Sequence, residues 1–369
     1  MQERDPRSCR KKWECMRDFK VSRRERFGLT RKGEQVDLYC LSGPRGMRLE
    51  ALTLGATIHR MFVPDAYGET RDIVLGKPTV EEYQSNGLCN SCVIGRYANR
   101  IENAAYVWKG RRVELERNYG PHTIHGGSGC YAGKVFCATP FEEEDCCGVR
   151  MSFLDMGTGG FPGTMPVSIE YRLRETGVDV IYSALPSADT PISITSHAYF
   201  NLNGHGAGSV EDHVLQIEAD AYLPTAADGI PTGEIRPVED TVFDFRTPRA
   251  LRDGLHSDEA QIEQFSGYDH NFCVRGTGMR RVASLYSARS GIQLSLYSDM
   301  PGVQFFTANR FPGKIRGKDE KLYDSHSAVC LETQQYPNAM NERGFPCPVA
   351  PAGRFWRSQT SFEFDALTH

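Results

Sequence analysis

Six short stretches of the sequence combine titratable and amide side chains with glycines and aromatic residues, which plain strands and turns do not need. In chain order they are GRYANRI, HTIHGG, TSHAYFNLNG, GYDHNFCV, GVQFFTANR and VCLETQQYPNAMN. Their candidate functional residues are Asn99, Arg100, His125, His197, Asp269, Gln304 and Glu332. Such a mixture suits a sugar ligand, because hydroxyl groups need several polar partners and the faces of a sugar ring stack on aromatic side chains.

Each candidate also has an ordinary structural explanation when it is considered alone. A glutamate at the end of a strand, such as Glu332, is commonly solvated, and a single histidine is commonly a hydrogen-bonded structural residue. Arg100 can be a surface cation and Asp269 a turn residue. The two glycines after His125 would let the backbone approach a ligand closely. Only the set as a whole favours a site for a ligand.

Composition and motifs argue against several other classes of protein. The net charge of −4 disfavours a general nucleic-acid or membrane-surface binder. No apolar run approaches the ~20 residues that a transmembrane helix needs. No Gly-rich phosphate loop and no Gly-x-Ser-x-Gly motif is present. The sequence also lacks an evident pair of carboxylates in matching contexts, which disfavours a glycosidase.

The chain contains 12 cysteines, and no secretory signal is visible at the N-terminus. We therefore expect reduced thiols and a cytoplasmic location. The stretch CNSC, from Cys89 to Cys92, has the spacing of half a zinc or redox site. Because no second pair accompanies it, we expect these cysteines to pack as small apolar residues and no metal to be bound.

Strand patterns with a period of two dominate the chain and must position the candidate residues. VSIEYRL and VDVIYSAL alternate on either side of RETG, which predicts a hairpin. Lys109-Gly110 predicts another hairpin, and IQLSLYSD a further strand. Only the segment near 249–265 has a helical pattern. We therefore expect one large all-β domain, an antiparallel sandwich over residues 28–369.

Residues 1–27 differ from the rest of the chain in composition. They carry ten Lys and Arg against five Asp and Glu, with few apolar residues. We expect a flexible basic extension that folding and activity do not require, with a binding arm as the alternative.

Six motifs occur in an order that resembles the galactose mutarotase (aldose 1-epimerase) family, and the match runs from about Gly28 to Phe364. They are LGATIHRMFVPDAYGETRDIVLG, GRYANRI, TIHGG, SHAYFNLNGHG, YLPTAADGIPTGEIRPVEDTVFDFR and ETQQYPNAMN. The resemblance implies a β-supersandwich with a shallow open cleft, a free aldose as partner, no cofactor, and a monomer or homodimer. It implies Glu332 as general base and His197 as general acid. The residues implied to hold sugar hydroxyls are Asn99, Arg100, His125, Asp269 and Gln304.

The activity that the resemblance implies is interconversion of the α and β anomers of free aldohexoses such as galactose and glucose. Ring opening removes a proton from the C1 hydroxyl while another proton reaches the ring oxygen. A glutamate is ionised at neutral pH, and nearby carboxylates can hold a histidine protonated. We therefore expect an ionised Glu332 and a protonated His197, with no covalent intermediate.

The sequence departs from the family pattern in two places. NGLCNSCV precedes the GRYANRI motif, where the family has an aromatic and small residues, and Phe136 stands near a family tryptophan. We expect both at the rim of the cleft, where they would affect sugar preference. The alternatives are a carbohydrate-binding module without catalysis, a hexose-6-phosphate epimerase with further Arg or Lys in its cleft, and a glycoside hydrolase.

Overall fold

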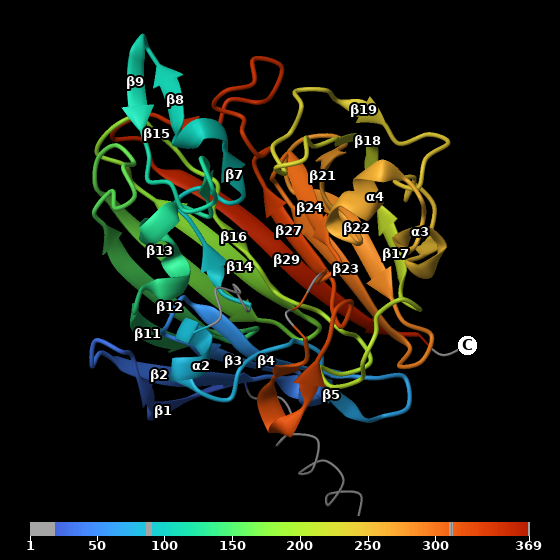
Figure 1. Cartoon of the computed structure of the whole chain (residues 1–369). Coiled ribbons are helices and arrows are strands. Elements are labelled where there is room, and N and C mark those ends of the chain that lie inside the picture. Colours follow the sequence, from blue (N-terminus) through green and yellow to red (C-terminus); the bar gives the residue numbers. More distant parts are fainter. Residues whose placement is uncertain (1–18, 86–90, 310, 312, 368–369) are drawn as a thin grey trace, which may run out of the picture.

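The structure is a computed structural model that describes residues 19–85, 91–309, 311 and 313–367. Strands form most of the regular structure in these ranges, and the pairs of named strands are antiparallel (Figure 1). They make three large sheets and several two-stranded ribbons. The expected all-β class and antiparallel architecture are confirmed.

The strands and helices have the following bounds. The first sheet comprises β1 (Lys20–Leu29), β2 (Gln35–Ser42), β3 (Arg48–Leu52), β4 (Thr57–Pro64) and β5 (Thr70–Asp72), in that order. The largest sheet comprises, in spatial order, β11 (Cys137–Glu142), β12 (Cys147–Asp155), β13 (Met165–Leu173), β14 (Gly177–Ala184), β29 (Trp356–Ala366), β23 (Ile292–Ser298), β22 (Arg280–Tyr286), β17 (Val214–Ile217) and β20 (Arg249–Ala250). The third sheet comprises β19 (Arg236–Pro237), β18 (Ala219–Leu223), β21 (Asp269–Val274), β24 (Gly302–Phe306) and β27 (Cys330–Gln334). The ribbons pair β7 (Arg100–Ile101) with β10 (Thr123–Ile124), β8 (Ala105–Trp108) with β9 (Arg111–Glu114), β6 (Val93–Ile94) with β16 (Thr195–Ser196), β15 (Thr190–Pro191) with β28 (Val349–Ala350), and β25 (Ile315–Arg316) with β26 (Leu322–Tyr323). The helices are α2 (Val80–Ser85), α3 (Arg252–Leu255), α4 (Ala260–Phe265) and the 3-10 turns η1 (Pro44–Gly46), η2 (Glu102–Ala104), η3 (Gly127–Gly129), η4 (Tyr131–Gly133) and η5 (Lys318–Glu320).

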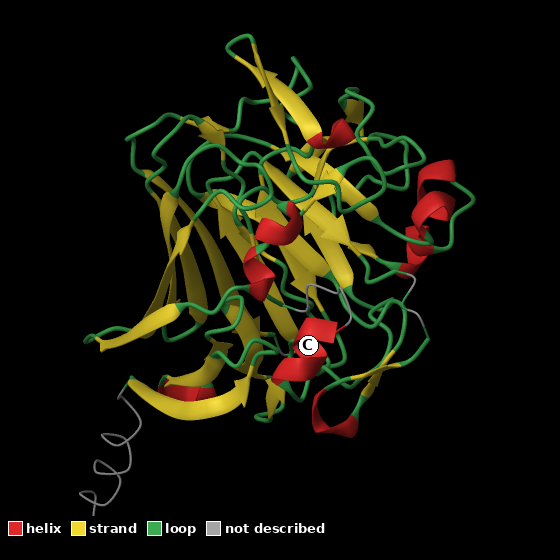
Figure 2. Cartoon of the chain, turned by 60° about the vertical axis from the view of Figure 1, so that its left-hand side comes forward, coloured by secondary structure: helices red, strands yellow, loops and turns green. Residues whose placement is uncertain are grey.

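One main apolar core is shared by the three large sheets. Leu49 of β3, Ile169 of β13 and Phe305 of β24 all belong to it and are fully buried. Figure 2 shows that the helices are short pieces among the loops around these strands. The strand β29 lies in the middle of the largest sheet, between β14 and β23. The sandwich therefore depends on pairing between segments that are far apart in the sequence.

The local elements agree with the sequence patterns except for one helix. β13 and β14 form the expected hairpin. Lys109 and Gly110, with φ of 48° and 77°, form the turn between β8 and β9. The expected helical segment contains α3 and α4, whereas α2 was not expected. Thr79 begins α2 by accepting a hydrogen bond from the backbone N–H of Glu82, a capping pattern that the sequence T-V-E-E contains. None of the helices in the described ranges is long and apolar enough to cross a membrane.

Strand β1 corrects the domain boundary expected at residue 28. Residues 1–18 lie outside the described residues, but Lys20–Leu29 pairs with β2. The Arg23 guanidinium binds the Asp37 carboxylate at 2.6 Å. β1 is an edge strand whose charged side chains are mostly exposed, and charged residues are common on such edges. Its polar composition therefore resembles that of a flexible extension.

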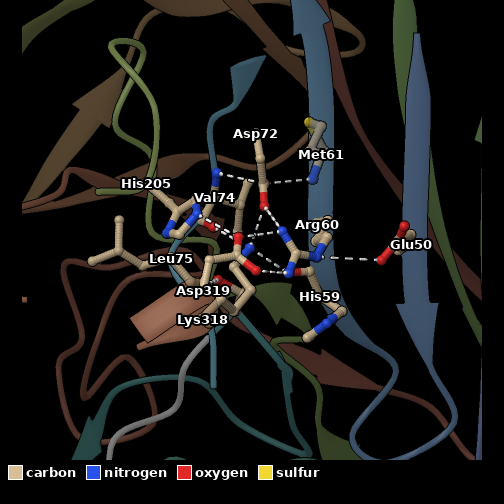
Figure 3. Close-up of polar contacts among 12 residues, drawn as sticks. Glu50, His59, Arg60, Met61, Asp72, Val74, Leu75, His205, Lys318 and Asp319 are labelled. Carbon is tan, nitrogen blue, oxygen red and sulfur yellow. Dashed lines mark hydrogen bonds and ion pairs between the residues drawn. The ribbon is translucent and has the colours of Figure 1, made fainter. Parts of the chain in front are cut away.

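Lys318 of η5 places a fully buried ammonium group against the first sheet (Figure 3). Its Nζ donates hydrogen bonds to Asp72 Oδ2 and to the backbone oxygens of His59 and Val74, each at 2.7 Å. Burial lowers the pKa of Lys318 to about 8, although the Asp72 carboxylate opposes this shift. Arg60 also binds Asp72, at 3.1 Å. Since all three donors of the ammonium have acceptors, the buried charge is well satisfied.

Removal of β1 tests the corrected boundary. A chain that starts at residue 19 is expected to be as stable as the full chain, because it keeps β1. A chain that starts at Gly28 loses most of β1 and the ion pair of Arg23 with Asp37, so its free energy of unfolding should fall by about 1–3 kcal/mol. Urea denaturation of the three chains measures this. Equal stability of the two shortened chains would contradict a packing role for β1.

Lys318→Met tests the buried ammonium. The substitution leaves the Asp72 carboxylate buried with one cationic partner fewer, and breaking a buried pair costs about 3–5 kcal/mol. Lys314→Met, at an exposed position, is the control. Urea denaturation should show the loss for Lys318→Met alone. A change within about 0.5 kcal/mol, the range of ordinary surface substitutions, would mean that the ammonium does not hold this junction.

Candidate active site

The strands β24 and β27 present alternate side chains to the core and to an open cleft. Phe305 and Leu331 belong to the core, so Gln304 and Glu332 face the opposite side. The register places Gln304 directly between Asn271 of β21 and Glu332 of β27. A polar row thus crosses three strands on one face of the third sheet.

Asp269 begins β21 on this polar face. Its Oδ1 accepts a hydrogen bond from Gln304 Nε2 at 2.7 Å, and its Oδ2 accepts one from Arg100 at 3.4 Å. The next residue, His270, points to the other face and packs against Phe243 with ring centroids 4.8 Å apart. Asp269 is therefore an oriented carboxylate and not a solvated turn residue.

Asn99, Arg100 and His125 come from the ribbon of β7 and β10. The backbone N–H of Asn99 donates to His125 Nδ1 at 3.1 Å, and the N–H of His125 donates to the Asn99 carbonyl at 2.9 Å. Asn99 Oδ1 accepts from the backbone and the side chain of Arg100. Asn99 and His125 have φ of 64° and 54°, a left-handed conformation that non-glycine residues rarely adopt. Such residues concentrate at functional sites.

The glycines after His125 serve the packing of the chain on itself. A Cβ at Gly126 would lie 2.5 Å from the Gly95 carbonyl oxygen, and its φ is 86°. A Cβ at Gly127 would lie 3.2 Å from a carboxylate oxygen of Glu116. The expectation that these glycines admit a ligand is therefore corrected: they admit neighbouring parts of the protein.

His197 follows β16 and faces Glu332. Its Nε2 lies 3.5 Å from Glu332 Oε1. The imidazole stacks on the Tyr199 ring at 5.0 Å with an interplanar angle of 10°, and the His125 ring meets it edge-on at 5.6 Å. The neighbouring rings thus orient the imidazole toward the carboxylate.

These residues border a cleft of about 480 Å³. Its lining residues are Asn99, Arg100, Asn118, Tyr119, Ile124, His125, His197, Tyr199, Asp269, Phe306 and Glu332. They include six of the seven residues expected from the sequence. The seventh, Gln304, lies buried beneath, against Asp269.

Four buried polar atoms at or beneath the cleft have no protein partner among the described residues. They are Arg100 Nε, His197 Nδ1, Gln304 Oε1 and Glu332 Oε2. Buried polar atoms nearly always have hydrogen-bond partners. Because all four border or underlie one cleft, they are groups with which a polar ligand could form hydrogen bonds.

Aromatic residues that were not assigned from the sequence also line the cleft. Tyr199 and Phe306 lie two residues after His197 and Gln304, so the strand period could have identified them. The Tyr119 ring lies 5.0 Å from the Arg100 guanidinium. Tyr119 belongs to a loop whose path no local pattern predicts.

The two departures from the family pattern do not lie at the rim. Phe136 is buried and packs against Phe153 in the core, with ring centroids 4.6 Å apart. Cys92 is buried behind His197, whose backbone N–H donates to the Cys92 carbonyl at 2.9 Å. Cys89 lies outside the described residues. The expected rim position is therefore wrong for Phe136 and Cys92.

A family model described as Aldose 1-epimerase matches residues 37–363. The chain belongs to the aldose 1-epimerase family. It is 37% identical to a galactose mutarotase from Sus scrofa over 320 residues, which cover 86% of this chain and 91% of the relative. It is 31% identical to an aldose 1-epimerase from Escherichia coli over 340 residues, covering 90% of this chain and 96% of the relative.

Solved structures of aldose 1-epimerase relatives have the same fold. A GalM/aldose epimerase homologue from C. elegans matches with a TM-score of 0.80 and 25% identity, over 88% of this chain and 97% of that one. A galactose 1-epimerase from Lactobacillus acidophilus matches with a TM-score of 0.83 and 22% identity, over 94% and 99% of the two chains. The second likeness concerns the fold alone.

In this member of the aldose 1-epimerase family, burial favours the neutral forms of the two facing groups. Burial raises the pKa of Glu332 well above its usual range, and the Asp269 carboxylate adds to this shift. Burial lowers the pKa of His197 to about 4. These directions are opposite to the expected ionised Glu332 and protonated His197. The neutral and ionic forms of the pair each hold one proton, so they differ only by its transfer between the two groups.

The buried histidines predict a loss of stability in acid. Away from the facing pair, burial lowers the pKa of His213 and His270 each to about 4. An unfolded histidine has a pKa of about 6.5, so the unfolded state binds more protons below that pH. The stabilisation is therefore fully present above about pH 6.5 and is lost as the pH falls toward 4. Urea denaturation at stepped pH should show this decline, and it should be smaller in His213→Gln. A constant free energy of unfolding between pH 6.5 and 4.5 would contradict it.

Proposed function

We propose that the protein catalyses the mutarotation of free aldohexoses such as galactose and glucose. The observation that carries the proposal is the contact of His197 with Glu332 in the cleft, at 3.5 Å. Two groups that exchange protons within reach of one ligand are what ring opening needs. The relatives named galactose mutarotase and aldose 1-epimerase support this class of substrate.

Glu332 and His197 divide the two proton transfers. Glu332 accepts the proton of the C1 hydroxyl while His197 donates one to the ring oxygen, so the ring C–O bond breaks and a carbonyl forms at C1. Rotation about the C1–C2 bond presents the other carbonyl face, and the reverse transfers close the ring. The reaction starts from the form of the pair with its proton on His197. After closure the pair again holds that one proton.

The other polar residues of the cleft hold the sugar hydroxyls in this proposal. Asp269 is oriented by Arg100 and Gln304, so its carboxylate can accept a hydrogen bond from a sugar hydroxyl in a fixed direction. The Asn99 N–H fixes the His125 ring, and the backbone and side chain of Arg100 fix the Asn99 amide. Fixed partners lower the entropy cost of orienting a sugar, which is otherwise well solvated.

The alternative functions fit this cleft less well. Arg100 is the only lysine or arginine among the described residues that line it, and Arg100 is bound to Asp269. A hexose phosphate would lack a free cation there. The cleft does hold two carboxylates, Asp269 and Glu332, which the sequence identified as candidates but not as a matched pair. Because Asp269 is held by Arg100 and Gln304, the group that faces Glu332 is His197, which disfavours a glycosidase. A binding module would not need the facing pair of His197 and Glu332.

A cytoplasmic location, the absence of a metal requirement, and a monomeric or homodimeric state remain predictions from the sequence.

Substitution of the pair tests the function. Glu332→Gln cannot accept the C1 hydroxyl proton, and His197→Asn cannot donate one to the ring oxygen. Each should lower kcat by roughly 10²–10⁴-fold. The double variant should be little worse than the worse single one, because the two groups act as a unit. Polarimetry of fresh α-D-galactose and α-D-glucose, with the spontaneous rate subtracted, measures kcat. The parent's kcat/KM should be bell-shaped in pH, since one proton on the pair is required.

Two exposed residues outside the cleft provide matched controls. Glu144→Gln and His256→Asn make the same chemical changes at exposed positions and should keep the parent rate. A parent protein that binds galactose without accelerating mutarotation would indicate a binding module. A Glu332→Gln protein within threefold of the parent would falsify the assignment of the base.

A further inference from the structure

Ser91 lies in the CNSC stretch, which the proposed function leaves without a role. It is fully buried, and its φ of 58° is in the left-handed region. This backbone conformation costs a non-glycine residue free energy that glycine does not lose. The Ser91 hydroxyl makes two hydrogen bonds that neither glycine nor alanine could make at this position.

The Ser91 hydroxyl connects two backbone groups that a strand ladder would join directly. The Leu75 N–H donates to the Tyr199 carbonyl at 2.9 Å, as in a ladder. The reciprocal bond passes through Ser91, because the Tyr199 N–H donates to Ser91 Oγ at 3.3 Å and Ser91 Oγ donates to the Leu75 carbonyl at 3.0 Å. The hydroxyl therefore satisfies one buried donor and one buried acceptor at once.

The same stretch also holds the backbone of His197. The His197 N–H donates to the Cys92 carbonyl at 2.9 Å, and the Ser91 N–H donates to the His197 carbonyl at 3.1 Å. The Ser91 carbonyl in turn accepts from the Ile58 N–H at 2.8 Å, which ties the stretch to β4. Ser91 thus binds the His197 carbonyl and the Tyr199 N–H, the backbone groups that lie between the two residues whose rings stack on each other.

We propose that Ser91 is a positioning residue, whose hydroxyl fixes the Tyr199 backbone so that the Tyr199 ring holds the His197 imidazole toward Glu332. Its effect on catalysis rests on the proposed function. The contact itself does not, since it orients the imidazole with or without a reaction. Proton transfer is sensitive to displacements of well under 1 Å, so a small rotation of the ring lowers kcat more than it changes KM.

Two substitutions separate the hydroxyl from the backbone strain. Ser91→Ala and Ser91→Gly both remove the hydroxyl, but only glycine relieves the left-handed φ. We expect kcat to fall by about 3- to 30-fold in both, with KM within about twofold of the parent. Ser91→Gly should melt at a higher temperature than Ser91→Ala. Equal losses of kcat at unequal melting temperatures would show that the hydroxyl, and not stability, controls the rate.

Ser287→Ala is the matched control. Ser287 is also buried, and its hydroxyl donates to Asn203 Oδ1 at 2.7 Å, away from the cleft lining. It should lower the melting temperature and leave kcat unchanged. Loss of kcat in Ser287→Ala equal to that in Ser91→Ala would overturn the proposal.

A second measurement does not depend on activity. The ring signals of His197 can be assigned by histidine-selective NMR with His197→Asn as reference, and the stacked Tyr199 ring shields them. In Ser91→Gly the His197 ring signals should move downfield, toward their positions in Tyr199→Leu. The double variant, with Ser91→Gly added to Tyr199→Leu, should have the same ring signals and the same kcat as Tyr199→Leu alone. Unmoved ring signals together with a kcat within twofold of the parent would refute the positioning role. If the parent does not accelerate mutarotation but the signals still move, the contact stands and the proposed function alone fails.

Discussion

The buried ammonium of Lys318 holds in place a backbone segment that pairs with Tyr199 of the cleft. Asp72 and the carbonyl of Val74 accept its hydrogen bonds. The next residue, Leu75, pairs with Tyr199 on the opposite side of that segment. The Tyr199 ring stacks on the imidazole of His197. A chain of contacts therefore links the orientation of the imidazole to the buried cation of Lys318. Water is excluded around the ammonium, so the loss of one of its hydrogen bonds would cost much free energy. The same bonds therefore hold the backbone from Asp72 to Leu75 rigidly.

Burial gives the cleft its chemistry as well as its shape. Because burial raises the pKa of Glu332 and lowers that of His197, it favours the form of the pair with the proton on Glu332, and that proton moves to His197 before the ring opens. The unpartnered atoms of Arg100, Gln304, His197 and Glu332 represent free energy that folding alone does not recover. A ligand with hydroxyl groups on several sides would recover it. The site therefore contributes less to the stability of the fold than a fully paired core would. It keeps free hydrogen-bonding atoms for a ligand.

The sequence predicted which residues share a site better than how deep each one lies. The ordered motifs grouped Asp269, Glu332 and Arg100 as candidates, and these residues line one cleft. Depth depends on residues distant in sequence. Gln304 therefore lies beneath the cleft and Phe136 lies in the core.

The charge states that burial favours for the facing groups differ from those expected from the sequence for the same reason, because pKa shifts follow desolvation, which no local pattern measures. The strand β1 was missed because an edge strand buries little and so has the composition of a tail.

The position of β29 has a consequence for synthesis on the ribosome. Trp356–Ala366 pairs with β14 on one side and β23 on the other, so the largest sheet stays in two halves until this last strand has been made. Each half then has an open edge with unpaired N–H and C=O groups, one along β14 and one along β23. The nascent chain exposes the β14 edge until β29 has been made, and the β23 edge for the shorter time between β23 and β29. Contacts this distant in sequence form slowly, and exposed edges attract other chains. Closure of the sheet by its central strand is therefore the step at which premature association competes with folding.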